Sequence, residues 1–155
     1  MKLNFSSPFK PRLIKDYKPK NLTIHTFNVG FKKKKDDLLI LSFNKVVNLS
    51  AVYSKTSTPS APIIWDKKNN RGFCKVLIVN SGNANAHTGK KGIKEIDKYT
   101  TEASKIFQCK KDEIIVSSTG IIGEQLDSSL IIKKLGYAKR FSSKKILDAA
   151  KAIMT

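Results

Sequence analysis

The residues of this chain that are best suited to chemistry lie in a small polar turn, Ser117–Gly120, which follows a predicted strand at about Glu113–Ser117. A chain that leaves a buried strand offers backbone N–H groups without ladder partners. Gly120 lets an oxygen approach the backbone closely, and Thr119 adds a hydroxyl donor. Such donors stabilise the negative charge that develops on a carbonyl oxygen during acyl transfer. A plain turn that satisfies its own backbone is the alternative, and the residues of the turn leave both open.

A second turn of the same kind, Asn80–Asn85, follows a predicted strand at about Phe73–Val79. Its three asparagines surround Gly82. Asparagine side chains hydrogen-bond nearby backbone and tolerate left-handed conformations, so we expect them to make this loop rigid. An anion-binding turn is the other interpretation. His87 follows, but no carboxylate or nucleophile stands beside it in the sequence, and a lone histidine is usually not catalytic.

Strands and helices in alternation are expected to position the two turns. Apolar residues at steps of three, four and seven predict an amphipathic helix between them, over about residues 90–108, with Thr88 as its cap. Before the first turn we expect a strand at Leu22–Phe27, a strand pair at 37–43 and 46–53, a hydroxyl-rich loop at 54–62, and a short helix or covering segment at Ile63–Trp65 in which Trp65 packs. After the second turn we expect a helix from Ser128 or Ser129 to Leu135, ended by Gly136. A last helix is expected from Ser142 or Ser143, with Ile146, Ala149, Ala150 and Ile153 on one stripe. This order predicts a mixed, layered α/β domain.

The composition excludes several classes of protein. With 155 residues, 40% of them hydrophobic, the chain can bury one core. The formal charge of +18 comes almost wholly from lysine, and the accompanying Ile and Asn are residues that A/T-rich codons encode, so nucleic-acid binding is not expected. Cys74 and Cys109 stand apart without a ligand cluster, which predicts neither a disulfide framework nor a metal site. No apolar targeting or membrane-spanning run is seen, so we expect a cytoplasmic protein that binds no membrane.

The two turns and the C-terminal segment resemble one family, the bifunctional arginine-biosynthesis enzymes that act as glutamate N-acetyltransferase and ornithine acetyltransferase. Four landmarks stand in the family's order: the strand Val46–Tyr53 leading to Ala61 and Pro62, the segment Val79–Gly89, the segment Ser118–Gly123, and the segment Ala149–Thr155. The resemblance covers most of residues 37–155, whereas residues 1–36, a basic N-terminal arm, match only loosely. It implies the layered α/β sandwich of the ornithine acetyltransferase type, present here as a partial α-chain domain at 37–155.

The resemblance also implies a mechanism. In that family the precursor cuts itself before a threonine, which becomes the N-terminal nucleophile of a second, β chain and carries the acetyl group from N-acetylornithine to glutamate. Thr119 and Gly120 then match the oxyanion hole, through the threonine hydroxyl and the glycine N–H, and Thr155 matches or adjoins a threonine that touches the substrate. The implied partner is the β chain, in a heterotetramer of two α and two β chains. No cofactor is implied, and acetyl-coenzyme A stays open as a second acetyl donor.

Beyond the Ile-Met-Thr string at Ile153–Thr155 the family pattern continues through a Thr-Asp-Thr segment, a substrate-binding lysine and the cleavage motif. None of these is found in residues 1–155. We therefore expect the chain to represent most of the first subunit, truncated before the cleavage site, and to be unable to transfer acetyl groups alone. Two other interpretations stay open, namely a lysine-rich module that binds anionic partners and an inactive truncated remnant.

Overall fold

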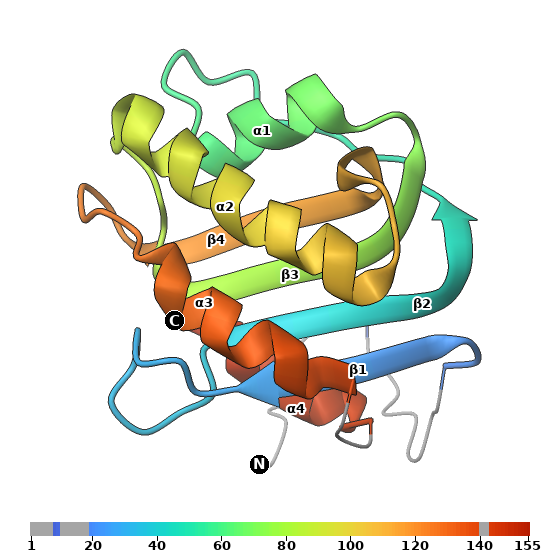
Figure 1. Cartoon of the computed structure of the whole chain (residues 1–155). Helices are drawn as coiled ribbons and strands as arrows, with labels where there is room; N and C mark the ends of the chain where they lie inside the picture. Colours follow the sequence, from blue (N-terminus) through green and yellow to red (C-terminus); the bar gives the residue numbers. More distant parts are fainter. Residues whose placement is uncertain (1–7, 10–18, 140–142) are drawn as a thin grey trace.

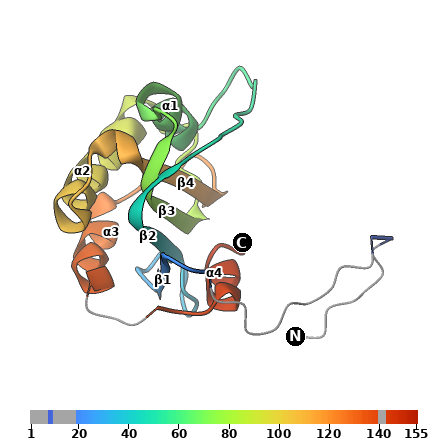
Figure 2. The ribbon, with the colours of Figure 1, turned by 90° about the vertical axis from the view of Figure 1, so that its right-hand side faces the viewer.

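The computed structural model describes residues 8–9, 19–139 and 143–155, and a four-stranded sheet forms its centre (Figure 1). The strands are β1 (Leu22–Phe27), β2 (Leu38–Asn48), β3 (Phe73–Asn83) and β4 (Ile114–Ile121), in that order across the sheet. The helices are α1 (Ala61–Asn69), α2 (Gly89–Phe107), α3 (Ser128–Leu135) and α4 (Ile146–Ala152). Figure 2 shows α1, α2 and α3 on one side of the sheet and α4 on the other. This layered arrangement confirms the predicted α/β fold class.

The direction of the strands brings the two polar turns together. β1, β2 and β3 pair antiparallel, whereas β3 and β4 pair parallel and are joined through α2. The C-terminal ends of two parallel neighbours meet at the same edge of a sheet. Accordingly Asn80 pairs with Ser118, and Gly82 pairs with Gly120. The prediction that residues 80–83 and 117–120 leave their strands is wrong, because they continue the ladder and make both strands longer. The strand ends with residues 80–85 and 117–120 are called the β3 turn and the β4 turn below.

The main core lies between the sheet and helices α1 to α3. α2 buries Ile96, Tyr99 and Ala103 on one face, against Val76 and Ile78 of β3. The predicted amphipathic helix is therefore confirmed. Thr88 occupies the N-cap position, as predicted, but its hydroxyl donates to the side chain of Asn85 and accepts no N–H from the helix.

The predicted strand pair at 37–43 and 46–53 is wrong, because β2 runs unbroken from Leu38 to Asn48. Its pairing with β3 shifts between Ser42 and Val47. The exposed residues Asn44 and Lys45, which separate the two predicted strands, lie in this irregular stretch, so they mark a shift of register within one strand. The predicted strand at Leu22–Phe27 is confirmed as β1, and it is part of the sheet.

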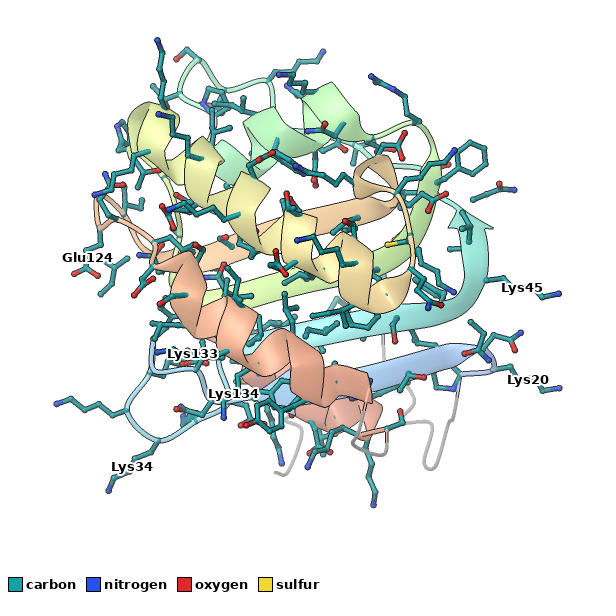
Figure 3. All side chains as sticks on the ribbon, viewed as in Figure 1. Lys20, Lys34, Lys45, Glu124, Lys133 and Lys134 are labelled. Carbon is teal, nitrogen blue, oxygen red and sulfur yellow. The ribbon has the colours of Figure 1, made fainter. Side chains whose placement is uncertain are left out.

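The β1–β2 connection is organised by one buried carboxylate. Asp37 accepts backbone N–H groups of Val29 at 2.7 Å, Gly30 at 3.2 Å and Lys32 at 2.7 Å, which fixes a turn that includes the lysine run. Residues 1–7 and 10–18 of the predicted basic arm, which include Arg12, lie outside the described residues, and so does Arg140. Figure 3 shows the labelled lysines projecting from several separate elements of the molecule.

The short helices agree with the sequence in type and differ in their ends. α1 takes the helical alternative and buries Trp65, as predicted. α3 ends before Gly136 as expected, but its cap is Asp127, whose carboxylate accepts the Ser129 N–H.

The last helix, α4, begins at Ile146, later than predicted, and the alternative start at Ser142 lies outside the described residues. It packs on Ile24 and Leu39 through two alanines, Ala149 and Ala152. Ile153 is 40% exposed, so the predicted stripe is only partly buried. α4 thus covers the β1 and β2 side of its face of the sheet, and the strand ends near Thr119 stay more open.

Candidate functional site

Two glycines face each other where β3 and β4 end. Gly82 and Gly120 are paired in register, with φ values of +99° and +134°, a region that side chains rarely adopt. A Cβ atom on Gly120 would lie 2.6 Å from both the Asn83 nitrogen and the Gly82 oxygen. The pairing is also irregular, since Asn83 pairs with residues on both sides of Gly120. A glycine is therefore required at position 120 because the β3 backbone occupies the space of a side chain. The sequence pattern predicted that this space would admit an approaching oxygen.

Thr119 presents its hydroxyl on the more open face of the sheet. It pairs in register with Ser81, whose Oγ donates to the carbonyl of Ala152 on α4 at 2.5 Å, so both side chains lie on the α4 face. Thr119 is half-buried, and within the described part of the chain its hydroxyl has no hydrogen-bond partner. The Ser117 hydroxyl, two residues earlier on the same face, is exposed and likewise has no hydrogen-bond partner among the described residues. The strand end thus offers a hydroxyl donor that the described protein does not use.

The C-terminal segment is held beside this strand end. Besides the Ser81 bond, Lys32 Nζ donates to the carbonyl of Met154 and, at 3.5 Å, to that of Ala152. Figure 2 places the C-terminus next to α4, on the side of the sheet away from α2. These bonds hold the segment that ends in Thr155 on the same face of the sheet as Thr119. Thr155 is exposed, and its contact with substrate stays a prediction.

Sequence reasoning missed Ser81 and Lys32, the two residues that anchor the C-terminal segment. Ser81 was read as part of a loop, but it is the position opposite Thr119 in a parallel ladder, and extending the strand to it would have revealed this. Lys32 stands in a run of four lysines that looked uniformly solvated, and no signal in the sequence distinguishes it from Lys33, Lys34 or Lys35. Both contacts join residues 71 to 122 positions apart.

The asparagines of the first turn are engaged within the protein. Asn80 is 1% exposed; its Nδ2 donates to the Asn83 carbonyl at 2.7 Å, and its Oδ1 accepts the Ser118 hydroxyl at 2.6 Å. Asn83 Oδ1 accepts the Asn85 N–H at 2.8 Å, and its Nδ2 donates to the Glu124 carbonyl at 3.2 Å. The expected bonding of asparagines to nearby backbone is confirmed, and these bonds tie the first turn to the second.

Asn85 continues the network into α2. It is fully buried with φ +45°, accepts the Thr88 hydroxyl at 2.7 Å, and donates to the Gly92 carbonyl at 3.2 Å. His87, in contrast, is exposed on the outside of the turn. The polar groups of the three asparagines are thus used to hold β3, β4 and α2 in place, which leaves the β4 turn as the one with a free side-chain donor.

Two buried hydroxyls contact carboxylates, and both have structural roles. The Ser128 hydroxyl donates to Glu95 at 2.5 Å, joining α3 to α2, and the Thr26 hydroxyl donates to Asp36 at 2.5 Å. The Ser128 bonds and the nearby Lys98 ammonium lower the pKa of Glu95 against the effect of its burial. Among the described residues, no group of three or more His, Cys, Asp or Glu side chains is arranged to hold a metal ion.

Comparison with known sequences gives one family. The ArgJ family model matches residues 23–155. The arginine biosynthesis bifunctional protein ArgJ of Bartonella henselae is 39% identical over 135 residues, which is 85% of this chain and 33% of that protein. The protein of the same name from Caldanaerobacter subterraneus is 33% identical over 139 residues, 88% of this chain and 34% of that protein. The chain therefore spans about a third of the length of these curated relatives.

Solved structures agree on the fold. The arginine biosynthesis bifunctional protein of Bacillus halodurans superposes with a TM-score of 0.78 at 27% identity, covering 88% of this chain and 73% of that one. The ornithine acetyltransferase of Mycobacterium tuberculosis, solved with ornithine, superposes with a TM-score of 0.80 over 88% of this chain and 77% of that one; at 23% identity this likeness shows the fold alone. With a family match over residues 23–155 and the same fold in a solved structure that bears the family's name, this chain belongs to the ArgJ family.

Proposed function

We propose that this chain is part of an arginine-biosynthesis acetyltransferase that moves the acetyl group of N-acetylornithine to glutamate. Its curated relatives are named arginine biosynthesis bifunctional proteins, and one structural neighbour is titled an ornithine acetyltransferase. The observation that carries the proposal is the Thr119 hydroxyl, unpartnered within the described residues, at the end of β4 beside the Gly82–Gly120 pair. A free donor at a rigid strand end suits an oxyanion hole.

In the proposed reaction the nucleophile is an N-terminal threonine of a β chain. Its hydroxyl oxygen bonds to the acetyl carbonyl carbon of N-acetylornithine, and the carbonyl oxygen becomes negative. The Thr119 hydroxyl and the Gly120 N–H donate to that oxygen. The α-amino group of the same threonine takes the hydroxyl proton and passes it to the nitrogen as the C–N bond breaks, so that ornithine leaves an acetyl-threonine. The amine of glutamate attacks this ester through a second tetrahedral intermediate, which the same two donors stabilise. The ester C–O bond then breaks, the attacking amine loses a proton, the threonine oxygen takes one back, and N-acetylglutamate leaves.

Thr119 itself is assigned the role of donor and not of nucleophile. A threonine hydroxyl needs an adjacent base to become nucleophilic, and within the described residues no histidine, lysine or carboxylate is hydrogen-bonded to Thr119. This supports the further proposals that the chain alone is inactive and that it works in a complex of α and β chains. Acetyl-coenzyme A as a second donor and a cytoplasmic location belong to the same proposal; none of the described helices is long and apolar enough to cross a bilayer.

A chimera tests this function. Residues 23–155 replace the matching part of the Bartonella henselae protein, and N-acetylglutamate is measured by mass spectrometry after addition of N-acetylornithine and glutamate. The chimera is expected to form N-acetylglutamate, and the 155-residue chain alone is expected to form none. The unmodified Bartonella protein is the positive control. Turnover by the chain alone that survives Thr119→Val would overturn the assignment of the nucleophile to a second chain.

A further inference from the structure

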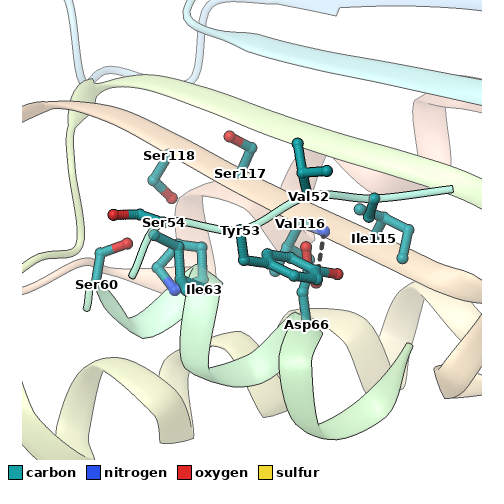
Figure 4. Close-up of a pocket in the computed structure, with 12 residues that line it drawn as sticks. Val52, Tyr53, Ser54, Ser60, Ile63, Asp66, Ile115, Val116, Ser117 and Ser118 are labelled. Atoms are coloured by element: carbon teal, nitrogen blue, oxygen red, sulfur yellow. Dashed lines mark hydrogen bonds between the residues drawn. The ribbon is translucent and has the colours of Figure 1, made fainter. Parts of the chain in front are cut away.

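A pocket with a volume of about 320 Å³ lies at the outer edge of the sheet, where β4 meets α1 and the segment Ala51–Ser54 (Figure 4). Its apolar lining comes from Val52, Ile63 and Ile115. Its polar side chains are five hydroxyls and one carboxyl: Tyr53, Ser54, Ser60, Ser117, Ser118 and Asp66. No lysine or arginine is among the lining residues. A concave site with an apolar wall and a few convergent polar groups is the usual form of a small-ligand site.

Asp66 is the unusual member of this lining. It is only 5% exposed, and its Oδ1 accepts the N–H of Val116 at 3.2 Å, which satisfies one backbone group on the free edge of β4. Within the described part of the chain, Oδ2 has no hydrogen-bond partner and Asp66 has no ion pair. A buried carboxyl without a counter-ion is costly, so it needs an explanation beyond one backbone bond.

The groups around Asp66 do not compensate its charge. Two neighbours, Cys74 on β3 and Tyr99 on α2, interact with the Asp66 charge. Burial, with a smaller contribution from that charge, raises the pKa of the Cys74 thiol to about 11 and also raises the pKa of the Tyr99 hydroxyl. Both are neutral at pH 7. Lys67, the next residue on α1, donates to the Ser54 carbonyl at 3.2 Å and lies 5.9 Å from the centre of the Tyr53 ring, and it does not line the pocket. Burial consequently raises the pKa of Asp66 to about 7.

We propose that this pocket binds a primary ammonium group, with the Asp66 carboxylate as its counter-ion and the surrounding hydroxyl oxygens as further acceptors. An ammonium carries three N–H donors, which Oδ2 and two hydroxyls can accept. The ammonium belongs to a small free amine or to a lysine side chain of another protein segment. The lining includes Ser117 and Ser118, which precede Thr119 on β4, but the proposed binding of an ammonium does not depend on the proposed acetyl transfer.

The ligand chemistry sets the pH dependence of binding. Asp66 must be ionised to pair with the ammonium, so affinity rises as the pH passes through about 7 and is greatest near pH 8 to 9, where the amine is still charged. From pH 8 to pH 5.5 we expect the dissociation constant to increase by about tenfold or more, following the fraction of ionised carboxyl.

The test is a calorimetric titration of the whole chain with n-butylammonium chloride at pH 8, and with Nα-acetyl-lysine amide in a second arm. Saturable binding of either probe supports the proposal, and the tighter one identifies the source of the ammonium. Asp66→Asn keeps an oxygen for the Val116 N–H and is expected to weaken binding at least tenfold. Glu124→Gln, which removes an exposed carboxylate, is the matched control and should bind as the wild type does.

Three results would overturn the proposal: no saturable binding of either probe, equal binding by the Asp66→Asn variant, or equally tight binding of uncharged n-butanol. If Asp66→Asn fails to fold, the wild-type chain still decides the question. An affinity for n-butylammonium that is unchanged between pH 5.5 and pH 8 excludes Asp66 as the counter-ion, and a tenfold fall at the lower pH supports it.

Discussion

The turns that end β3 and β4 are neighbours in one sheet with similar composition, yet they differ in what their side chains do. In the β3 turn, Asn80 and Asn85 are buried and bonded to other parts of the chain. In the β4 turn, Ser117 and Thr119 point to the open face, and their hydroxyls have no partner among the described residues. The difference teaches that one turn supplies rigidity and the other supplies donors. A preorganised donor needs a neighbour of this kind, because only a rigid support keeps it aimed.

The contact between the turns is the feature most sensitive to change. In Gly120→Ala the new Cβ meets the β3 backbone, 2.6 Å from the Asn83 nitrogen, at a φ of +134°. We expect a loss of about 4 kcal/mol or more in the free energy of unfolding, measured by urea denaturation. Gly136→Ala, where a Cβ meets nothing within 4 Å, is the control and should change stability by less than about 0.5 kcal/mol. Equal stability of the two variants would mean that the strand ends are not in contact.

Asp66, which accepts the Val116 N–H on the outer side of β4, makes the free energy of unfolding depend on pH. Native Asp66 keeps its proton up to about pH 7, whereas the unfolded chain loses it near the ordinary value of 3.8. The native state therefore holds the extra proton between these values, and stability falls as the pH rises from 4 to 7. We expect the wild type to lose on the order of 3 kcal/mol in this window relative to Asp66→Asn. Parallel unfolding curves of the two proteins from pH 4 to 8 would contradict this account.

The network of the β3 turn predicts a smaller loss of stability. Asn80→Ala removes both bonds of a buried amide and leaves the Ser118 hydroxyl and the Asn83 carbonyl without their partner. The expected loss is about 2 to 3 kcal/mol in the free energy of unfolding. Asn48→Ala, an exposed asparagine on β2, serves as control and is expected to be nearly neutral. A neutral Asn80→Ala would break the comparison, since the first turn would then not be a support.

Much of the fold could be predicted from the sequence, because local patterns decide it. The period of α2 and the alternation of β1 indicate these elements correctly. The errors arose where another contact replaces the expected local one. The Thr88 hydroxyl bonds to Asn85, three residues earlier, in place of a helix N–H, and Asn44 and Lys45 lie in an irregular stretch of β2 that depends on pairing with β3.

The candidate site shows the same limit. The local signal, a strand followed by Ser, Thr and Gly, left a plain turn open as the alternative, and the family resemblance assigned Thr119 and Gly120 to the oxyanion hole. The reason why position 120 needs a glycine could not be found from the sequence, since the backbone that excludes a side chain there belongs to β3. Asp66 begins a polar run at residues 66–70, and nothing local in the sequence indicates that it is buried or that it accepts the Val116 N–H, 50 positions away. Residue type thus indicates donors, and tertiary contacts decide which of them stay free.

The measurement that tests this account most directly compares Thr119→Val with Ser117→Ala in the chimera described above. Valine keeps the shape of threonine and removes only the free hydroxyl, so the free energy of unfolding should change by less than about 0.5 kcal/mol. N-acetylglutamate formation should fall about 100- to 1000-fold in Thr119→Val, the usual loss for one oxyanion-hole donor, and stay near wild type in Ser117→Ala. Full activity of Thr119→Val would contradict the claim that the β4 turn supplies the donor.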